Sequence, residues 1–216
     1  MFSGSNAEVW CCDLDSFPYE DEIEMLSKEE RSRADRFFQR AHRSRYLAAH
    51  VALRHLIGDM TGKSPGSLTL LSGRFGKPYI ADGSTCHFNL SHSGGMALIA
   101  LSSQCEVGVD IELTADLETA PELAAQHFCA DELSEWSALP ATQRMDSFYK
   151  IWTRKEACVK ATGWGLQLPP STVCVGLDLT EKRMKLPLPD GSVSAVVVQS
   201  LPLGNGSFGA FACVLA

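Results

Sequence analysis

The sequence contains no long hydrophobic run. Its longest apolar stretches, such as residues 96–101, fall far short of the roughly 20 residues that a membrane-spanning helix needs. The first residues include neither a basic segment nor the apolar core of a secretory signal. These features predict a cytoplasmic protein with no membrane association.

The chain also lacks a C-x-x-C pair, zinc-spaced Cys and His residues, a phosphate-binding P-loop and a G-x-S-x-G nucleophile motif. It has eight cysteines, with Cys11 next to Cys12. This pattern predicts reduced thiols, most of them buried as small core residues. A G-x-G-x-x-G match at residues 204–209 is followed by too little sequence for a dinucleotide-binding unit. We therefore expect a hairpin turn there.

An excess of positive charge is missing as well. The net charge is −7 over 216 residues, which argues against a general nucleic-acid binder. Residues 28–54 are the exception, because they carry eight Lys or Arg against three acidic residues. This run favours a phosphate-bearing ligand or an acidic protein partner, although a solvated helix face gives the same pattern.

The expected elements repeat one order, a strand, then helices, then strands. In the first half we expect strands at 9–14, 68–71, 79–80, 88–90, 97–101 and 107–113, helices within 27–60, and a turn at 91–95. In the second we expect helices at 121–127, 130–139 and 147–162, and strands at 173–177, 193–198 and 208–215. Gly163 would end the long helix. The sequence thus predicts an α+β fold of two similar halves, residues 1–108 and 109–216, with a ligand cleft between them.

The strand at residues 107–113 carries two carboxylates on one face. Because side chains alternate along a strand, Asp110 and Glu112 point away from the apolar face formed by Val107, Val109 and Ile111. Paired carboxylates repel each other unless they hold a cation or a proton, and hard oxygen ligands suit Mg²⁺. The alternative is a solvated strand face.

The long second-half helix carries Trp152, Glu156 and Lys160 one turn apart, on one stripe. Glu156 is a candidate third metal ligand or base, and Lys160 a candidate charge stabiliser or acid. The alternative is a surface ion pair. Ser91 and His92 precede Gly94 and Gly95, where a turn exposes donors to an anion. The alternative there is an ordinary hairpin turn.

The order of these motifs along the chain is distinctive. Gly76-Lys77-Pro78 is followed by the segments 88–93, 108–112 and 152–160 and then by Gly165-Leu166. This series resembles the phosphopantetheinyl transferases of the surfactin-synthetase-activating type, and the segment 41–44 is similar too. The resemblance implies a monomer of two α+β halves with coenzyme A and Mg²⁺, or Mn²⁺ as an alternative, in the cleft.

The resemblance also implies roles for individual residues. The metal ligands would be Asp110, Glu112 and Glu156. The pyrophosphate of coenzyme A would contact Lys77, Ser91, His92 and Lys155, and its 3′-phosphate would contact Arg43, Ser44 and Arg33 or Arg40. The catalytic residues would be Glu156, Lys160 and His92. Trp164 stands where members of the family often have a basic residue.

The function implied is transfer of the 4′-phosphopantetheine arm of coenzyme A to a serine of an apo acyl, peptidyl or aryl carrier protein. A small acidic carrier would dock on the basic segment or on an apolar patch near the cleft. Two other functions stay open at this point. A Mg²⁺-dependent nuclease would release nucleotides from DNA, and an inactive binding module would hold coenzyme A without producing 3′,5′-ADP.

Overall fold

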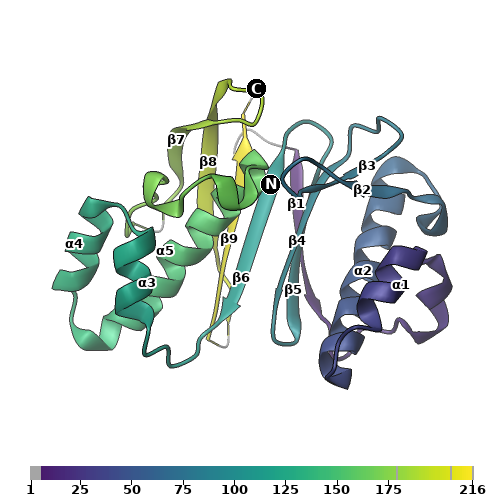
Figure 1. The fold of residues 1–216 in the computed structure, drawn as a ribbon, viewed down its shortest axis with the longest axis horizontal. Coiled ribbons are helices and arrows are strands. Elements are labelled where there is room, and N and C mark those ends of the chain that lie inside the picture. Colours follow the sequence, from purple (N-terminus) through teal and green to yellow (C-terminus); the bar gives the residue numbers. More distant parts are fainter. Residues whose placement is uncertain (1–5, 179, 205, 216) are drawn as a thin grey trace.

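Strands lie side by side in the middle of the molecule and helices lie on the outside (Figure 1). The structure, a computed structural model, describes residues 6–178, 180–204 and 206–215. It has the mixed α+β architecture that the sequence predicts, in two halves that follow each other along the chain.

The first half contains a three-stranded antiparallel sheet of order β1-β5-β4 and a separate ribbon of β2 and β3. Its elements are β1 (Ala7–Asp13), α1 (Lys28–Ala34), α2 (Arg40–Thr61), β2 (Leu70–Ser72), β3 (Pro78–Ile80), β4 (His87–Ser93) and β5 (Met96–Ser102).

The second half contains a four-stranded antiparallel sheet of order β6-β9-β8-β7. Its elements are β6 (Val107–Leu113), α3 (Ala120–His127), α4 (Ala130–Ala138), α5 (Ala141–Thr162), β7 (Lys182–Pro187), β8 (Val193–Leu201) and β9 (Ser207–Val214). Across the part of the chain described, no helix combines the length and apolar character needed to cross a membrane.

The two halves share one plan. In each main sheet the first strand pairs with the last strand of that half, β1 with β5 and β6 with β9. Each half also has one helix of 22 residues, α2 or α5. Both helices end at a glycine with positive φ, Gly62 at 71° and Gly163 at 76°, a conformation that costs glycine little. The predicted end of the long second-half helix at Gly163 is confirmed.

Strand β6 contributes to two cores. Val107, Val109 and Ile111 pack between the two sheets, against residues such as Leu98 and Phe211. The opposite face of β6 meets α5, whose residues Ala157 and Ala161 belong to the core of the second half. The alternation predicted for this strand is therefore confirmed, and its polar positions face a helix.

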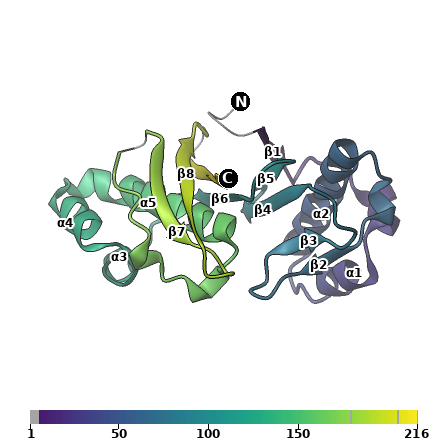
Figure 2. The ribbon, with the colours of Figure 1, turned by 90° about the horizontal axis from the view of Figure 1, so that it is seen from above.

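The sheets meet at a seam between β4 and β6, which lie next to each other in Figure 1 and in the view from above in Figure 2. There, backbone amides of β6 donate hydrogen bonds to side-chain oxygens of β4 instead of to its backbone carbonyls. The amide of Val109 donates to Asn89 Oδ1 at 2.9 Å, and the amide of Leu113 donates to Ser93 Oγ at 3.2 Å. The seam is therefore lined with polar side chains.

Several predicted boundaries were wrong. Ser91, His92 and Ser93 lie in β4 rather than in a turn, and α5 begins at Ala141. Residues 173–177 form no strand, because the amides of Val175 and Gly176 donate to Glu132 Oε1 at 2.6 and 2.9 Å instead of to a neighbouring strand.

Further differences concern β7 and the boundary between the halves. The sequence analysis missed β7. This strand contains three Lys or Arg residues and buries only Leu186, so it has little apolar pattern. The boundary proposed after residue 108 falls inside β6, whereas the two sheets separate between Ser102 and Val107. In the segment 204–209, Asn205 lies outside the described residues, and the segment leads from β8 into β9.

Gly108 allows α5 to pack directly on β6. A Cβ at this position would lie 2.1 Å from the Ala157 carbonyl oxygen and 2.4 Å from the Ala161 amide nitrogen. We predict that Gly108→Ala lowers the free energy of unfolding by about 1–3 kcal/mol, because helix and strand must separate. Urea denaturation tests this. Gly204→Ala is the matched control, since a Cβ there meets nothing within 4 Å, and an equal loss in both variants would contradict the explanation.

Candidate active site

Two acidic side chains of β6 face two charged side chains of α5 beside the seam. Asp110 and Glu112 share the face of Gly108, so the close packing at Gly108 brings α5 over them. Glu156 and Lys160, one turn apart on α5, lie toward these carboxylates. Trp152, which was predicted to share this stripe, does not join them. It stacks on Phe148 at the core of the second half, with ring centroids 5.8 Å apart.

Asp110 is at the centre of this arrangement. Its side chain is only 5% exposed, and its Oδ1 accepts from Lys160 Nζ at 2.6 Å and from Ser91 Oγ at 2.9 Å. Lys160 Nζ also donates to Ser91 Oγ at 3.0 Å. Asp110 Oδ2 is buried and has no hydrogen-bond partner; among the described side chains only Arg154 Nε shares this state. A buried carboxylate oxygen without a donor is costly, so Asp110 Oδ2 is a candidate ligand atom.

Burial is the largest cause that raises the pKa of each of the three carboxylates, Asp110, Glu112 and Glu156. Burial raises the pKa of Asp110, although Lys160 and Ser91 oppose this effect. Burial is also the largest cause of the raised pKa of Glu112, and Asp110 adds to it. The pKa of Glu156 is raised by burial and then by Asp110. Three carboxylates therefore face one ammonium group, so the site favours a further positive charge.

This donor set fits a hard divalent cation. All three groups offer oxygen, as Mg²⁺ and Mn²⁺ prefer, and Asp110 Oδ2 is an unused ligand atom. In the side-chain positions described, no three His, Cys, Asp or Glu residues are grouped closely enough to hold an ion. Asp110, Glu112 and Glu156 are the residues that would hold a metal, and Lys160 Nζ lies 2.6 Å from Asp110 Oδ1.

Basic side chains lie next to this acidic group. His92 is exposed at the end of β4, next to Ser91. Desolvation by the surrounding protein lowers its pKa most, and the nearby His50, Lys160, Arg33 and His42 lower it further. The imidazole is therefore neutral at neutral pH. An anion that entered between these groups would relieve their mutual repulsion.

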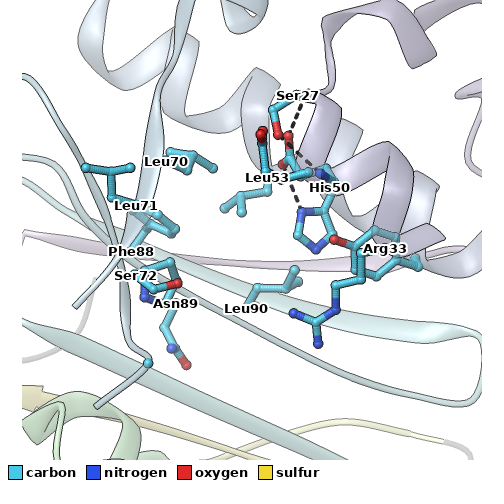
Figure 3. A pocket seen from close by; sticks show the side chains of 15 residues that line it. Ser27, Arg33, His50, Leu53, Leu70, Leu71, Ser72, Phe88, Asn89 and Leu90 are labelled. Atoms are coloured by element: carbon cyan, nitrogen blue, oxygen red, sulfur yellow. Dashed lines mark hydrogen bonds and ion pairs between the residues drawn. The ribbon is translucent and has the colours of Figure 1, made fainter. Parts of the chain in front are cut away.

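A pocket of about 340 Å³ opens in the first half, between α1, α2, β2 and β4. In Figure 3, Arg33 and His50 lie on one side of it, and Leu70, Ser72 and Asn89 lie on the other. The pocket reaches the seam at Asn89. Its apolar lining with a few convergent polar groups is typical of a small-molecule site.

His50 is held in place by two neighbours. Its Nδ1 lies 3.1 Å from Glu30 Oε1, and its ring packs on Tyr46 with centroids 4.1 Å apart. A carboxylate at Nδ1 fixes the proton on that nitrogen and leaves Nε2 for a ligand. The sequence analysis missed His50, because its spacing along α2 differs in no way from that of a core residue.

Glu30 also binds the buried guanidinium of Arg54, which donates to Glu30 Oε2 at 3.1 Å from Nε and 2.7 Å from Nη2. The side chains of Arg54 and Glu30 are 1% and 11% exposed. Bonds from His50, Arg54 and Ser27 outweigh burial and lower the pKa of Glu30 to about 2. The Ser27-x-x-Glu30 spacing is a capping-box pattern that indicates the start of α1, but only the fold shows its partner Arg54.

Two predicted phosphate ligands need correction. Lys155 is wholly buried in the second half, where its Nζ pairs with Glu132 at 2.6 Å and donates to the Pro170 and Val173 carbonyls. It is not available to coenzyme A, and we remove it from the expected site. Lys77 Nζ binds Glu106 and the Val107 and Ala161 carbonyls. It joins the two halves and has no donor left for a ligand.

The residues predicted to contact the 3′-phosphate separate into two groups. Arg33 lines the pocket of Figure 3. Arg43 forms an ion pair with Asp35 at 3.1 Å, and its side chain is 43% exposed. Ser44 is half-buried on α2 and Arg40 is exposed, and neither lines this pocket.

Comparison with known proteins covers most of the chain. Residues 106–199 match the family model of the 4′-phosphopantetheinyl transferase superfamily. Residues 15–104 match the model of the N-terminal part of 4′-phosphopantetheinyl transferases. The two matched regions correspond to the two halves of the fold.

Individual relatives agree with the family models. The 4′-phosphopantetheinyl transferase Sfp of Bacillus subtilis is 32% identical, over 78% of this chain and 73% of its own length. A putative 4′-phosphopantetheinyl transferase of Synechocystis is 33% identical, over 74% of this chain and 65% of its own length. The transferase HetI of Nostoc is 38% identical, over 65% and 61%. The chain thus spans less than two thirds of the Synechocystis and Nostoc relatives.

The Glu30–Arg54 pair generates a pH-dependent prediction. A pKa lowered from 4.5 to about 2 stabilises the fold above about pH 4.5, and this stability is lost as the pH falls toward 2. We expect Glu30→Gln to lower the free energy of unfolding by about 3 kcal/mol at neutral pH, because Arg54 loses its buried partner.

Urea denaturation between about pH 7 and pH 3 tests this expectation, and the difference from the unmodified protein must shrink over the acidic part of that range. Glu29→Gln is the matched control, because Glu29 is an exposed neighbour that forms no ion pair with any described residue. A deficit for Glu30→Gln that stays constant with pH would rule out the ionised pair as its cause.

Proposed function

The protein belongs to the 4′-phosphopantetheinyl transferase superfamily, and from this we propose that it transfers the 4′-phosphopantetheine arm of coenzyme A to a serine of an apo carrier protein. The observation that carries the proposal is the group of Asp110, Glu112 and Glu156 beside Lys160 and Ser91 at the seam. Phosphoryl-type transfer depends on positioning and charge neutralisation, and this group supplies both.

The nucleotide end of coenzyme A enters the pocket of Figure 3. Arg33 and His50 line the pocket and bind its phosphate groups. Arg33 donates from its guanidinium, and His50 donates from the Nε2–H that its protonated ring carries while Nδ1–H remains bonded to Glu30. The pyrophosphate then lies at the seam, where Ser91 and His92 follow Asn89 along β4. Lys160 exchanges its bond to Asp110 for one to a phosphate oxygen.

The reaction forms one bond and breaks one. The carrier serine oxygen bonds to the β-phosphorus of coenzyme A, and the bond from that phosphorus to the bridging oxygen breaks, which releases 3′,5′-ADP. Glu156 accepts the serine proton. Lys160 stabilises the leaving phosphate oxygen, and His92 binds the pyrophosphate as a hydrogen-bond donor. A divalent cation held by the three carboxylates neutralises phosphate charge when it is bound.

The remaining parts of the proposal rest on the sequence and the family. Coenzyme A and an apo acyl, peptidyl or aryl carrier are the partners. The metal is Mg²⁺, with Mn²⁺ as the alternative. A monomeric state and a cytoplasmic location stay predictions of the sequence analysis.

Removing a carboxylate tests the central group. We expect Asp110→Asn and Glu156→Gln each to lower turnover at least about 100-fold, because one charge-stabilising group is lost. The assay combines coenzyme A, Mg²⁺ and a panel of apo carriers, and it follows the intact carrier mass together with 3′,5′-ADP release. Near-normal transfer by either variant would exclude that carboxylate from the mechanism, and no added mass on any carrier would reject the function.

The pocket assignment has its own test. We expect His50→Ala to raise the KM for coenzyme A about tenfold while the KM for the carrier stays unchanged, since a hydrogen bond to a charged phosphate is lost. His55→Ala is the matched control on the same helix, where His55 Nε2 pairs with Glu22 at 2.6 Å outside the pocket. An unchanged KM for coenzyme A in His50→Ala would place the nucleotide elsewhere.

A further inference from the structure

Two cysteines meet where the segment that connects the two sheets reaches β6. Cys105 lies in this segment, residues 103–106, and is half-buried, whereas Cys213 in β9 is 1% exposed. Cys105 packs against the apolar cluster that contains Cys213 and Val107. Both cysteines are reduced in the structure, so the two thiols are available for chemistry with each other.

The pairing of β6 with β9 brings the two side chains to the same side of the sheet. Val107 pairs with Cys213, and the amide of Val214 donates to the Glu106 carbonyl at 2.9 Å, which continues the pairing one residue beyond β6. Cys105 precedes Val107 by two residues and is therefore a diagonal neighbour of Cys213. The Cys213 thiol donates a hydrogen bond to the Cys105 sulfur, so the two sulfur atoms are in contact.

A buried serine fixes the position of Cys105. Ser102 Oγ lies 3.4 Å from Cys105 Sγ, and it accepts from the amides of Gln104 and Cys105 at 3.2 and 3.3 Å. Because the serine oxygen already accepts two hydrogen bonds, its hydroxyl is placed to donate to the sulfur. Hydrogen bonds from a serine and from a second cysteine stabilise the thiolate form of Cys105.

The charged side chains around this segment also favour the thiolate. His87 and Lys77 both bind Glu106, the histidine at 2.9 Å. The hydrogen bond from Cys213 is the largest cause that holds the pKa of Cys105 well below its usual range. The serine hydroxyl and His87 lower this pKa as well, whereas burial and Glu106 oppose them. Since the thiolate is the nucleophilic form of cysteine, Cys105 is suited to attack an electrophile.

We propose that Cys105 and Cys213 are a redox-sensitive pair that a peroxide converts into a disulfide. With hydrogen peroxide, the Cys105 thiolate attacks one oxygen, so that an S–O bond forms, the O–O bond breaks and the other oxygen takes a proton and leaves as water. Cys213 then attacks the Cys105 sulfur, so that the S–S bond forms, the S–O bond breaks and a second water leaves. The two thiols lose the two electrons that the peroxide gains, and an external dithiol reverses the change.

The disulfide would tie the segment between the two sheets to β9. The same segment carries Glu106, which binds Lys77 and thereby helps to join the two halves. A reactive cysteine without a partner thiol is oxidised further and irreversibly, whereas Cys213 consumes the sulfenic acid as it forms. This proposal concerns a modification site and does not depend on the transferase function.

Peptide mapping of the unmodified protein tests the pair. The reduced protein is treated with hydrogen peroxide, its remaining thiols are blocked with iodoacetamide, and it is digested without a reductant. We expect a linked peptide pair that contains Cys105 and Cys213, and dithiothreitol should separate it. If this linked pair is absent, or if Cys105 is linked to a different cysteine, the proposal is overturned.

The role of Cys213 has a separate test. In Cys213→Ala, oxidation of Cys105 should stop at the sulfenic acid, so dimedone should form an adduct on Cys105 that the unmodified protein lacks. An adduct of equal yield in both proteins would contradict the role of Cys213. Because Cys213 is buried, thermal unfolding checks that the variant folds, and the mapping of the unmodified protein decides the question if it does not.

The reactivity of Cys105 is compared with that of Cys11, the matched control within the same protein. Cys11 on β1 is exposed, and burial raises its pKa. Alkylation by iodoacetamide should therefore begin at a lower pH at Cys105 than at Cys11, although Cys105 is the less exposed thiol. Alkylation that begins at the same pH at both sites, or first at Cys11, would contradict Cys105 as the attacking thiol.

Discussion

The direct packing of α5 on β6 at Gly108 is the constraint on which the rest of the site depends. Any side chain larger than hydrogen would push the helix away from the strand. At this distance, Lys160 reaches Asp110 and Ser91, which belong to two different sheets. The seam between the two halves is therefore held together by the same residues that carry the proposed chemistry.

Three buried ion pairs described in this protein differ in how many of their charged atoms have hydrogen-bond partners. Glu30 with Arg54 and Glu132 with Lys155 are surrounded by further donors and acceptors, so they stabilise the fold. Asp110 with Lys160 leaves one carboxylate oxygen unpaired next to two more carboxylates. A buried carboxylate oxygen without a hydrogen-bond partner has a free-energy cost. A bound cation would offset this cost by interacting with that oxygen.

The first half supplies most of the contacts proposed for coenzyme A, whereas the second half supplies the carboxylates and the lysine. The pocket with His50 and Arg33 belongs to the first half. The acidic group belongs to β6 and α5. Because the seam is where these two sets meet, a change in how the halves pack would affect binding and chemistry together.

The sequence by itself determined the strand β6, the end of α5 at Gly163 and the stripe that contains Glu156 and Lys160, because periodicity and a glycine cap are local properties. Only the tertiary structure decided which lysines face the seam. Lys155 and Lys160 are close in the sequence, yet one is buried against Glu132 and the other faces the seam. The roles of His50 and Cys105 also emerged only from the fold, since they depend on neighbours that are distant in the sequence.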